Sequence, residues 1–123
     1  LPKDSKLSMK KTFDLSLDLC TAGWNTYAAM ALPGSQLYKT AIQEGHKLPE
    51  NYEAYSFHAY NTQPLPTEYL TPEEILAYRD KCYSEYHTYA PFLKKIEKKF
   101  GIKAMENIKK MAILKLKRRI LGD

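Results

Sequence analysis

Few side chains in this sequence have both the type and the spacing that a chemical site requires. The three histidines, His46, His58 and His87, do not have the spacing of metal ligands. Cys20 and Cys82 are too far apart for a zinc or iron–sulfur motif, and we expect both to be small buried hydrophobic residues, with a disulfide as the minor alternative. No Gly-x-Ser-x-Gly motif and no glycine-rich phosphate loop is present. The sequence therefore predicts no catalytic and no metal-binding residue.

One histidine differs from the others because of its neighbours. His58 lies close to Tyr55 and Tyr60, in a stretch from Leu48 to Leu70 that is rich in proline and tyrosine. An imidazole there can donate a proton or contact a substrate, but a structural histidine hydrogen-bonded in a loop is the more common case. Because disordered segments contain few aromatic residues, we expect this stretch to be an ordered loop that covers something.

The element that would position such a site is the stretch from Trp24 to Tyr38. Trp24–Ala31 is rich in strand-forming and small apolar residues. Pro33 and Gly34 end this strand, and Ser35 can begin the helix that follows. Strand, turn and helix are half of a βαβ unit, in which ligands bind beyond the carboxyl ends of the strands. A parallel strand needs neighbours and the sequence contains no convincing second long strand, so we expect a piece of a larger α/β protein.

Helices are expected on both sides of this strand. Apolar residues recur at helical spacing from about Ser5 to Leu19, and Asp4 or Ser5 can cap the first turn of this helix. The residues after the turn predict a second, shorter helix that Gly45 ends.

The region after the loop is expected to be helical. Thr71, Pro72 and Glu74 form a capping box with proline at the first helical position. That helix ends before Pro91, which can open a short helix that Gly101 closes. An apolar stripe then predicts a last helix; its members are Met105, Ile108, Ala112, Leu116 and Ile120, and the basic residues beside them are Lys109, Lys110, Lys115, Lys117, Arg118 and Arg119.

Charge is distributed unevenly along the chain. The net charge is +5, but residues 1–93 contain eight Lys and Arg against eleven Asp and Glu, and residues 94–123 contain eleven against three. A basic end on an acidic body can bind nucleic acid or an acidic partner, and it can equally be an exposed helix face. Because no aromatic residue between Gly101 and Asp123 could stack on a base, nucleic acid is the less favoured partner. We expect the apolar stripe to dock on the protein itself rather than on a membrane.

The order of these segments resembles one enzyme family. The resemblance rests on LPKDSKLSMKKTFDLSLDL, a strand that ends in ALPGSQLY, EGHKLPENYEAYSFHAYNTQPLPTEYLTPEEILAYRD, and FLKKIEKKFG. Together they resemble the C-terminal part of radical S-adenosylmethionine enzymes that carry an N-terminal cobalamin-binding domain; beyond Gly101 only the basic helical character agrees. The resemblance implies the end of a partial (β/α) barrel in residues 1–47 (fifth helix, sixth strand, sixth helix), a connecting loop in 48–70 and a C-terminal helical extension in 71–123. The expected fold is thus mainly α-helical, with one or two strands.

The resemblance also implies cofactors. In such enzymes a CxxxCxxC loop binds a [4Fe–4S] cluster that cleaves S-adenosylmethionine to a deoxyadenosyl radical, and some members use cobalamin. This chain lacks the CxxxCxxC loop, the cobalamin-binding segment and the glycine that usually precedes the first Leu-Pro, so it would bind no cofactor and catalyse nothing by itself. The sixth strand ends near the adenine. The residues implied are Met30, Ala31 and Leu32 as adenine contacts, and Tyr55, His58 and Tyr60 as substrate-side contacts.

Two functions remain open at this point. In the first, the chain belongs to a radical enzyme, a methyltransferase or a ring-forming or rearranging catalyst, and its partner is the rest of the parent chain. A piece with an unpaired strand is then expected to be marginally stable or to form a homodimer. In the second, the chain is a helical binding module whose basic C-terminal helix engages nucleic acid or an acidic partner. With neither a signal-peptide layout nor a long apolar run, the sequence favours a cytoplasmic protein without a membrane partner.

Overall fold

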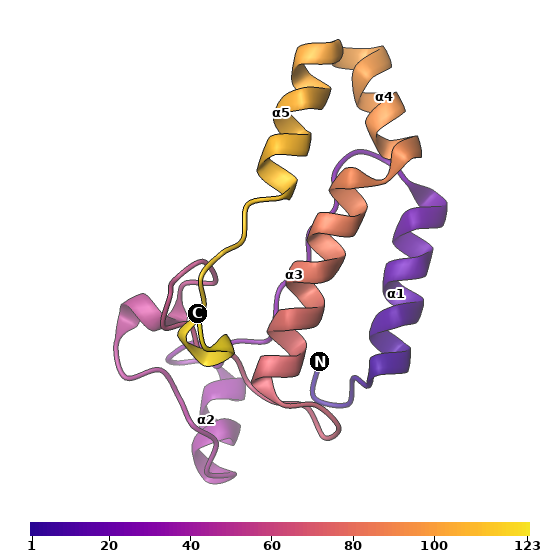
Figure 1. Cartoon of the computed structure of the whole chain (residues 1–123). Helices are drawn as coiled ribbons and strands as arrows, with labels where there is room; N and C mark the ends of the chain where they lie inside the picture. The colour runs from indigo at the N-terminus through magenta and orange to yellow at the C-terminus, as the bar shows by residue number, and fades with distance from the viewer.

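The computed structural model describes all residues from Leu1 to Asp123 and consists of helices joined by irregular segments (Figure 1). The α-helices are α1 Lys6–Leu19, α2 Gln36–Gln43, α3 Pro72–Thr88, α4 Ala90–Phe100 and α5 Ile102–Ala112, and the 3-10 helices are η1 Tyr52–Tyr55 and η2 Arg119–Leu121. The prediction of a mainly α-helical chain is confirmed. None of the helices has the length and apolar character needed to cross a membrane.

Side-chain caps explain where three of the helices begin. The Ser5 hydroxyl accepts a hydrogen bond from the amide of Ser8 at 3.2 Å, and Ser35 caps α2 in the same way. At the start of α3 the Thr71 hydroxyl accepts from the amide of Glu74 at 3.3 Å, while the Glu74 carboxylate accepts from the amide of Thr71 at 3.0 Å. These bonds satisfy amides that have no partner inside the helix. The predicted starts of α1, α2 and α3 are therefore correct.

Helix α3 is the centre of the molecule. Helix α1 lies along one side of α3, and α4 and α5 form a hairpin that contacts α3 and continues beyond it (Figure 1). Trp24 packs between Phe13 of α1 and Tyr86 of α3, with ring centroids 5.4 and 5.8 Å from its own. The buried residues of this main cluster are Phe13, Cys20, Cys82, Tyr86, Phe92 and Leu93.

The core is small for a chain of this length. Only 20 of the 123 residues are buried, and two lesser clusters form around Phe57 and around Ala31. Leu7, Leu15 and Leu19 of α1 remain 63%, 57% and 61% exposed, although the opposite side of the same helix carries Phe13 into the core. Helix α1 is therefore apolar on two sides and buries only one of them.

The predicted strand Trp24–Ala31 is extended but forms no sheet. No backbone N–H from Thr21 to Ala31 donates to a backbone carbonyl. The carbonyl of Ala29 accepts from the amide of Leu65 at 2.9 Å, which is a single contact rather than a ladder. The expectation of one or two strands is thus not met within this chain, because this single bond is the only backbone hydrogen bond between the segment and a distant part of the chain.

The last helix is shorter than predicted. Helix α5 ends at Ala112, and the chain then runs in extended form to η2 instead of continuing as a helix to Ile120. Arg118, which the helical pattern places on the basic face, is completely buried. Arg118 instead makes tertiary contacts, which are described below.

Candidate functional site

The end of the extended segment offers limited surface to a ligand. Ala31 is 1% exposed and packs with Ala41 and Leu65, so its side chain belongs to the core. Met30 is half-buried and Leu32 is exposed. A turn follows at once, in which the Leu32 amide donates to the Met30 carbonyl at 2.9 Å. The adenine contact predicted for Met30, Ala31 and Leu32 stays a prediction. Of the three, only Met30 and Leu32 have side chains that are accessible to a ligand.

The aromatic loop does not gather its predicted residues around one cavity. Tyr55 is half-buried with its ring 6.4 Å from that of Tyr52, and burial together with the nearby Tyr38 and Tyr52 raises the pKa of its phenol. His58 is exposed, with its ring edge-on to Phe57 at a centroid distance of 5.7 Å. His58 lines one of the two cavities described below, and Tyr55 and Tyr60 line neither of these two.

Tyr60 has a structural role. Its hydroxyl donates to the carbonyl of Asp123 at 2.9 Å, and its own carbonyl accepts from the amide of Arg119 at 2.8 Å. Tyr60 therefore attaches the end of the chain to the loop. A role for Tyr60 as a substrate contact would have to use the exposed part of its ring.

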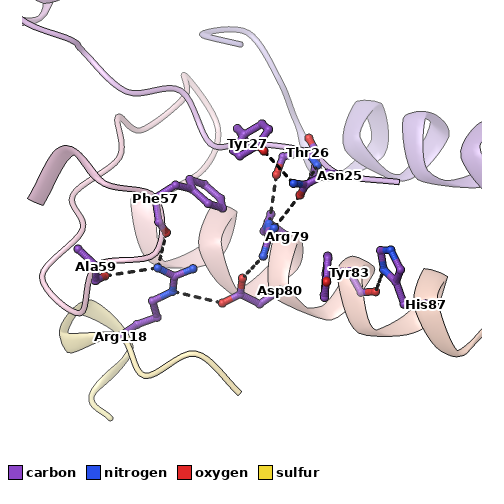
Figure 2. A network of polar contacts seen from close by, with 10 residues as sticks. All are labelled: Asn25, Thr26, Tyr27, Phe57, Ala59, Arg79, Asp80, Tyr83, His87 and Arg118. Carbon is purple, nitrogen blue, oxygen red and sulfur yellow. Dashed lines mark hydrogen bonds and ion pairs between the residues drawn. The ribbon is translucent and has the colours of Figure 1, made fainter. Parts of the chain in front are cut away.

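Arg79 holds the extended segment against α3 (Figure 2). Its Nε donates to the carbonyl of Thr26 at 3.1 Å, its Nη2 to Asn25 Oδ1 at 2.7 Å and its Nη1 to Asp80 Oδ1 at 3.0 Å. The side chain is buried. No sequence motif indicates a role for Arg79. It does occupy a position of the apolar α3 stripe between Ile75 and Cys82, where a buried residue is expected.

Arg118 completes the cluster from the other end of the chain. Its Nη1 donates to the carbonyls of Phe57 and Ala59 at 2.5 and 3.4 Å, and its Nε lies 3.5 Å from Asp80 Oδ2. Asp80 lies between the two guanidinium groups (Figure 2). The guanidinium carbons of Arg79 and Arg118 lie 4.7 and 5.6 Å from the centre of the Phe57 ring, within cation–π range.

This arginine cluster joins four separate parts of the chain. The extended segment, the aromatic loop, α3 and the C-terminal residues each contribute at least one of its groups. Two guanidinium groups share one carboxylate, and Arg118 Nη2 is buried without a hydrogen-bond partner. Desolvation of the charges offsets much of the attraction within such a cluster, whereas removal of one partner is costly because it leaves the other buried group unpaired.

Two cavities flank the cluster. The first, of about 720 Å³, lies between α3 and the residues that follow α5, with Arg79, Asp80 and His58 in its wall. Its cations have carboxylate partners, since Lys81 lies 3.6 Å from Glu85 and Lys115 pairs with Asp123. The second, of about 550 Å³, follows the extended segment between α1 and α3; its apolar lining includes Met9, Phe13, Trp24, Ala28 and Tyr78.

Metal ligands do not come together in this chain. No group of three His, Cys, Asp or Glu side chains is placed to hold an ion. Cys20 and Cys82 are free thiols in the main core, as predicted, and burial raises the pKa of Cys82. His87 Nδ1 lies 2.8 Å from the carbonyl of Tyr83, which is a local structural contact. The residues present do not fit an iron–sulfur cluster.

Comparisons with protein-family models, with curated proteins and with solved structures gave no match for this chain.

Proposed function

We propose that this chain is the C-terminal part of a radical S-adenosylmethionine enzyme of the kind that carries a cobalamin-binding domain, and that it completes a partial (β/α) barrel. The observation that carries the proposal is the extended backbone of Trp24–Ala31, whose N–H groups donate to no backbone carbonyl and which lies between helices α1 and α2 in the chain. Helix, strand and helix in this order are what one section of such a barrel requires. The sequence resemblance described above agrees with this section.

The backbone of the extended segment supports the proposal because it is ready to pair. Buried peptide groups in a folded protein are nearly always hydrogen-bonded, yet no N–H from Thr21 to Ala31, including those of buried Ala28 and Ala31, has a backbone partner here. A strand from the preceding part of a barrel would supply those partners. Pairing would also place the end of the strand at Met30–Leu32, where ligands bind in α/β folds.

The exposed side of α1 supports the same conclusion. A helix on the outside of a barrel packs against the strands and also against neighbouring helices, so it needs apolar residues on more than one side. Leu7, Leu15 and Leu19 provide this second apolar side. In the proposed enzyme they would contact the helix that precedes α1.

We propose binding roles but no catalytic role for the residues of this chain. S-adenosylmethionine would lie against Met30 and Leu32, with Tyr55 and His58 on the substrate side, whereas the cluster and any cobalamin would be held by other parts of the enzyme. The buried positions of Cys20 and Cys82 support this division, because neither thiol is available as a ligand. Which methyl-transfer, ring-forming or rearranging reaction the enzyme performs would be set by those other parts.

The test is the metal content of the complete gene product, purified without oxygen. We expect iron and labile sulfide in equal amounts, as in a [4Fe–4S] cluster, with cobalt showing whether cobalamin is used. The 123-residue chain taken through the same reconstitution serves as the control and should retain neither iron nor sulfide. A complete gene product that holds no cluster after reconstitution would refute the proposal.

A further inference from the structure

The hairpin of α4 and α5 is the part of the molecule that projects farthest from the arginine cluster. Its turn lies at the end of the molecule opposite α2 and the C-terminus (Figure 1). The two helices meet at a single residue, Gly101, whose φ of +87° lies in the region that favours glycine. The turn therefore presents a compact tip without a loop.

The two sides of this hairpin differ sharply. Its inner side packs on the main core through Phe92, Leu93, Ile96, Met105 and Ile108. The remaining surface of the hairpin carries seven exposed lysines against two glutamates; the lysines are Lys94, Lys95, Lys98, Lys99, Lys103, Lys109 and Lys110. None of the seven forms an ion pair, and only Lys95 has a protein partner, the carbonyl of Cys20. The hairpin thus presents unneutralised positive charge.

The tip adds apolar surface to this charge. Phe100 and Ile102, on either side of Gly101, are 62% and 56% exposed. Lys98, Lys99 and Lys103 stand next to them, and Lys99 Nζ lies 5.3 Å from the centre of the Phe100 ring. Both apolar residues follow the helical pattern that predicts contact with the core, yet the turn at Gly101 directs them away from it.

We propose that this tip binds the surface of an anionic lipid bilayer, with Phe100 and Ile102 in the interface and the surrounding lysines on the lipid phosphates. Peripheral membrane binding combines a small apolar insertion with electrostatic attraction of this kind. Lysine side chains suit it because their flexible stems lie along apolar surface while the ammonium groups reach the headgroups. The proposal goes beyond the radical-enzyme function, does not depend on it, and departs from the expectation of no membrane partner.

The chemistry of the hairpin favours lipid over nucleic acid. Every cation from Lys94 to Lys110 is a lysine, whereas the arginines, which recognise phosphate and bases through a planar fork, lie elsewhere in the chain. A single phenylalanine gives one stacking surface, and Ile102 would have no role in contacting a base. The interfacial region of a bilayer accommodates both residues.

Co-sedimentation with lipid vesicles tests the proposal. We expect the 123-residue chain to bind vesicles of phosphatidylcholine with a minor fraction of phosphatidylglycerol, to bind vesicles of phosphatidylcholine alone weakly, and to lose binding as salt increases. Single-stranded poly(U) RNA is the competing probe. Tighter binding to poly(U) than to the anionic vesicles at equal salt would overturn the lipid assignment, and so would an absence of vesicle binding at low salt.

Two sets of variants separate charge from insertion. Lys98→Gln/Lys99→Gln/Lys103→Gln should weaken binding by about fivefold per lysine, roughly a hundredfold together. Lys3→Gln/Lys39→Gln/Lys47→Gln, at three exposed lysines outside the hairpin, removes the same charge and should have little effect. Phe100→Ser/Ile102→Ser should weaken binding on the order of tenfold, while Leu7→Ser/Leu15→Ser, at exposed apolar positions of α1, should not.

Insertion itself has a direct spectroscopic signal. In Phe100→Trp, brominated acyl chains should quench the new indole, whereas the native Trp24, half-buried against the main core and away from the tip, should stay unquenched. Equal effects of the hairpin variants and their controls would refute the proposed surface. So would an unquenched indole at position 100 in vesicle-bound protein.

Discussion

The guanidinium of Arg118 donates a hydrogen bond of 2.5 Å to the carbonyl oxygen of Phe57, 61 residues away along the chain. This bond ties the last residues of the chain to the aromatic loop. Because Arg118 also lies 3.5 Å from Asp80 of α3, it joins three segments through one side chain. The basic C-terminal region therefore contains one arginine that is structural and a separate set of lysines that faces solvent.

Arg118→Met should destabilise the chain by about 2–4 kcal/mol, because it leaves the carbonyl of buried Phe57 without a donor and removes one of the two guanidinium partners of Asp80. Urea unfolding followed by circular dichroism measures the change. Arg119→Met is the matched control, since Arg119 is exposed and should change the free energy of unfolding by less than about 0.5 kcal/mol. Equal effects of the two substitutions would show that the buried cluster does not hold the C-terminal residues.

Glu74→Gln should make stability less dependent on pH. A hydrogen bond from Lys6 and one from the amide of Thr71 hold the pKa of Glu74 below its ordinary value of 4.5, so its charged form stabilises the folded state. This contribution to stability is present above pH 4.5 and is lost as the pH falls through the lowered pKa of Glu74. Glutamine keeps the capping bond but loses the charge, so the melting temperatures of native and variant chains should differ near neutral pH and converge in acid.

Glu73→Gln is the control for this substitution. Glu73 carries the same charge in the same helical turn but forms no ion pair. If Glu73→Gln changes the pH dependence of the melting temperature as much as Glu74→Gln does, the proposed role of the Lys6 contact is contradicted.

Tyr78 should titrate last among the tyrosines. Burial, followed by a hydrogen bond to the Cys82 thiol, raises the pKa of Tyr78 from 10.0 to about 12. The neutral phenol is therefore favoured in the folded state, and this contribution to stability is present below pH 10 and is lost as the pH rises through about 12. An ultraviolet titration should show one late phenolate that Tyr78→Phe removes. Its survival in the variant would assign the late step to another tyrosine.

The amides of Tyr27, Ala28, Met30 and Ala31 should exchange quickly with deuterated solvent in a dilute monomer of this chain, because none donates to a backbone carbonyl. Amides in the middle of α3 should exchange slowly and provide the internal reference. In the proposed radical enzyme the same four amides should become protected by strand pairing. Sedimentation in parallel establishes that the sample is monomeric, since a dimer through the extended segment would also protect them.

Local features of the sequence determined most of the helices. Ser5, Ser35 and Thr71 begin the first three because each hydroxyl reaches an amide three residues ahead, a contact that depends on no other part of the chain. Gly101 ends α4 because it can adopt a positive φ. Such signals lie within four residues of the bond they form, which is why they could be read directly.

The candidate site was harder to predict. The sequence pointed to Tyr55, His58 and Tyr60 as one aromatic group. In the structure Tyr60 is hydrogen-bonded to the C-terminal residue Asp123, and His58 lines a cavity. Arg79 and Arg118 did not stand out, because an arginine in a helical pattern normally faces solvent. Whether a charged side chain is buried depends on partners that arrive from distant segments.

Local signals in the sequence account for the caps, the helical segments up to Gly101 and the extended character of Trp24–Ala31. Long-range contacts, by contrast, determine that α5 stops at Ala112, although its apolar stripe continues to Ile120. The physical reason is that helix formation and long-range contacts compete for the same residues. The buried contacts of Arg118 with Phe57 and Asp80 require the preceding segment to be extended. No residue pattern within that segment predicts these contacts.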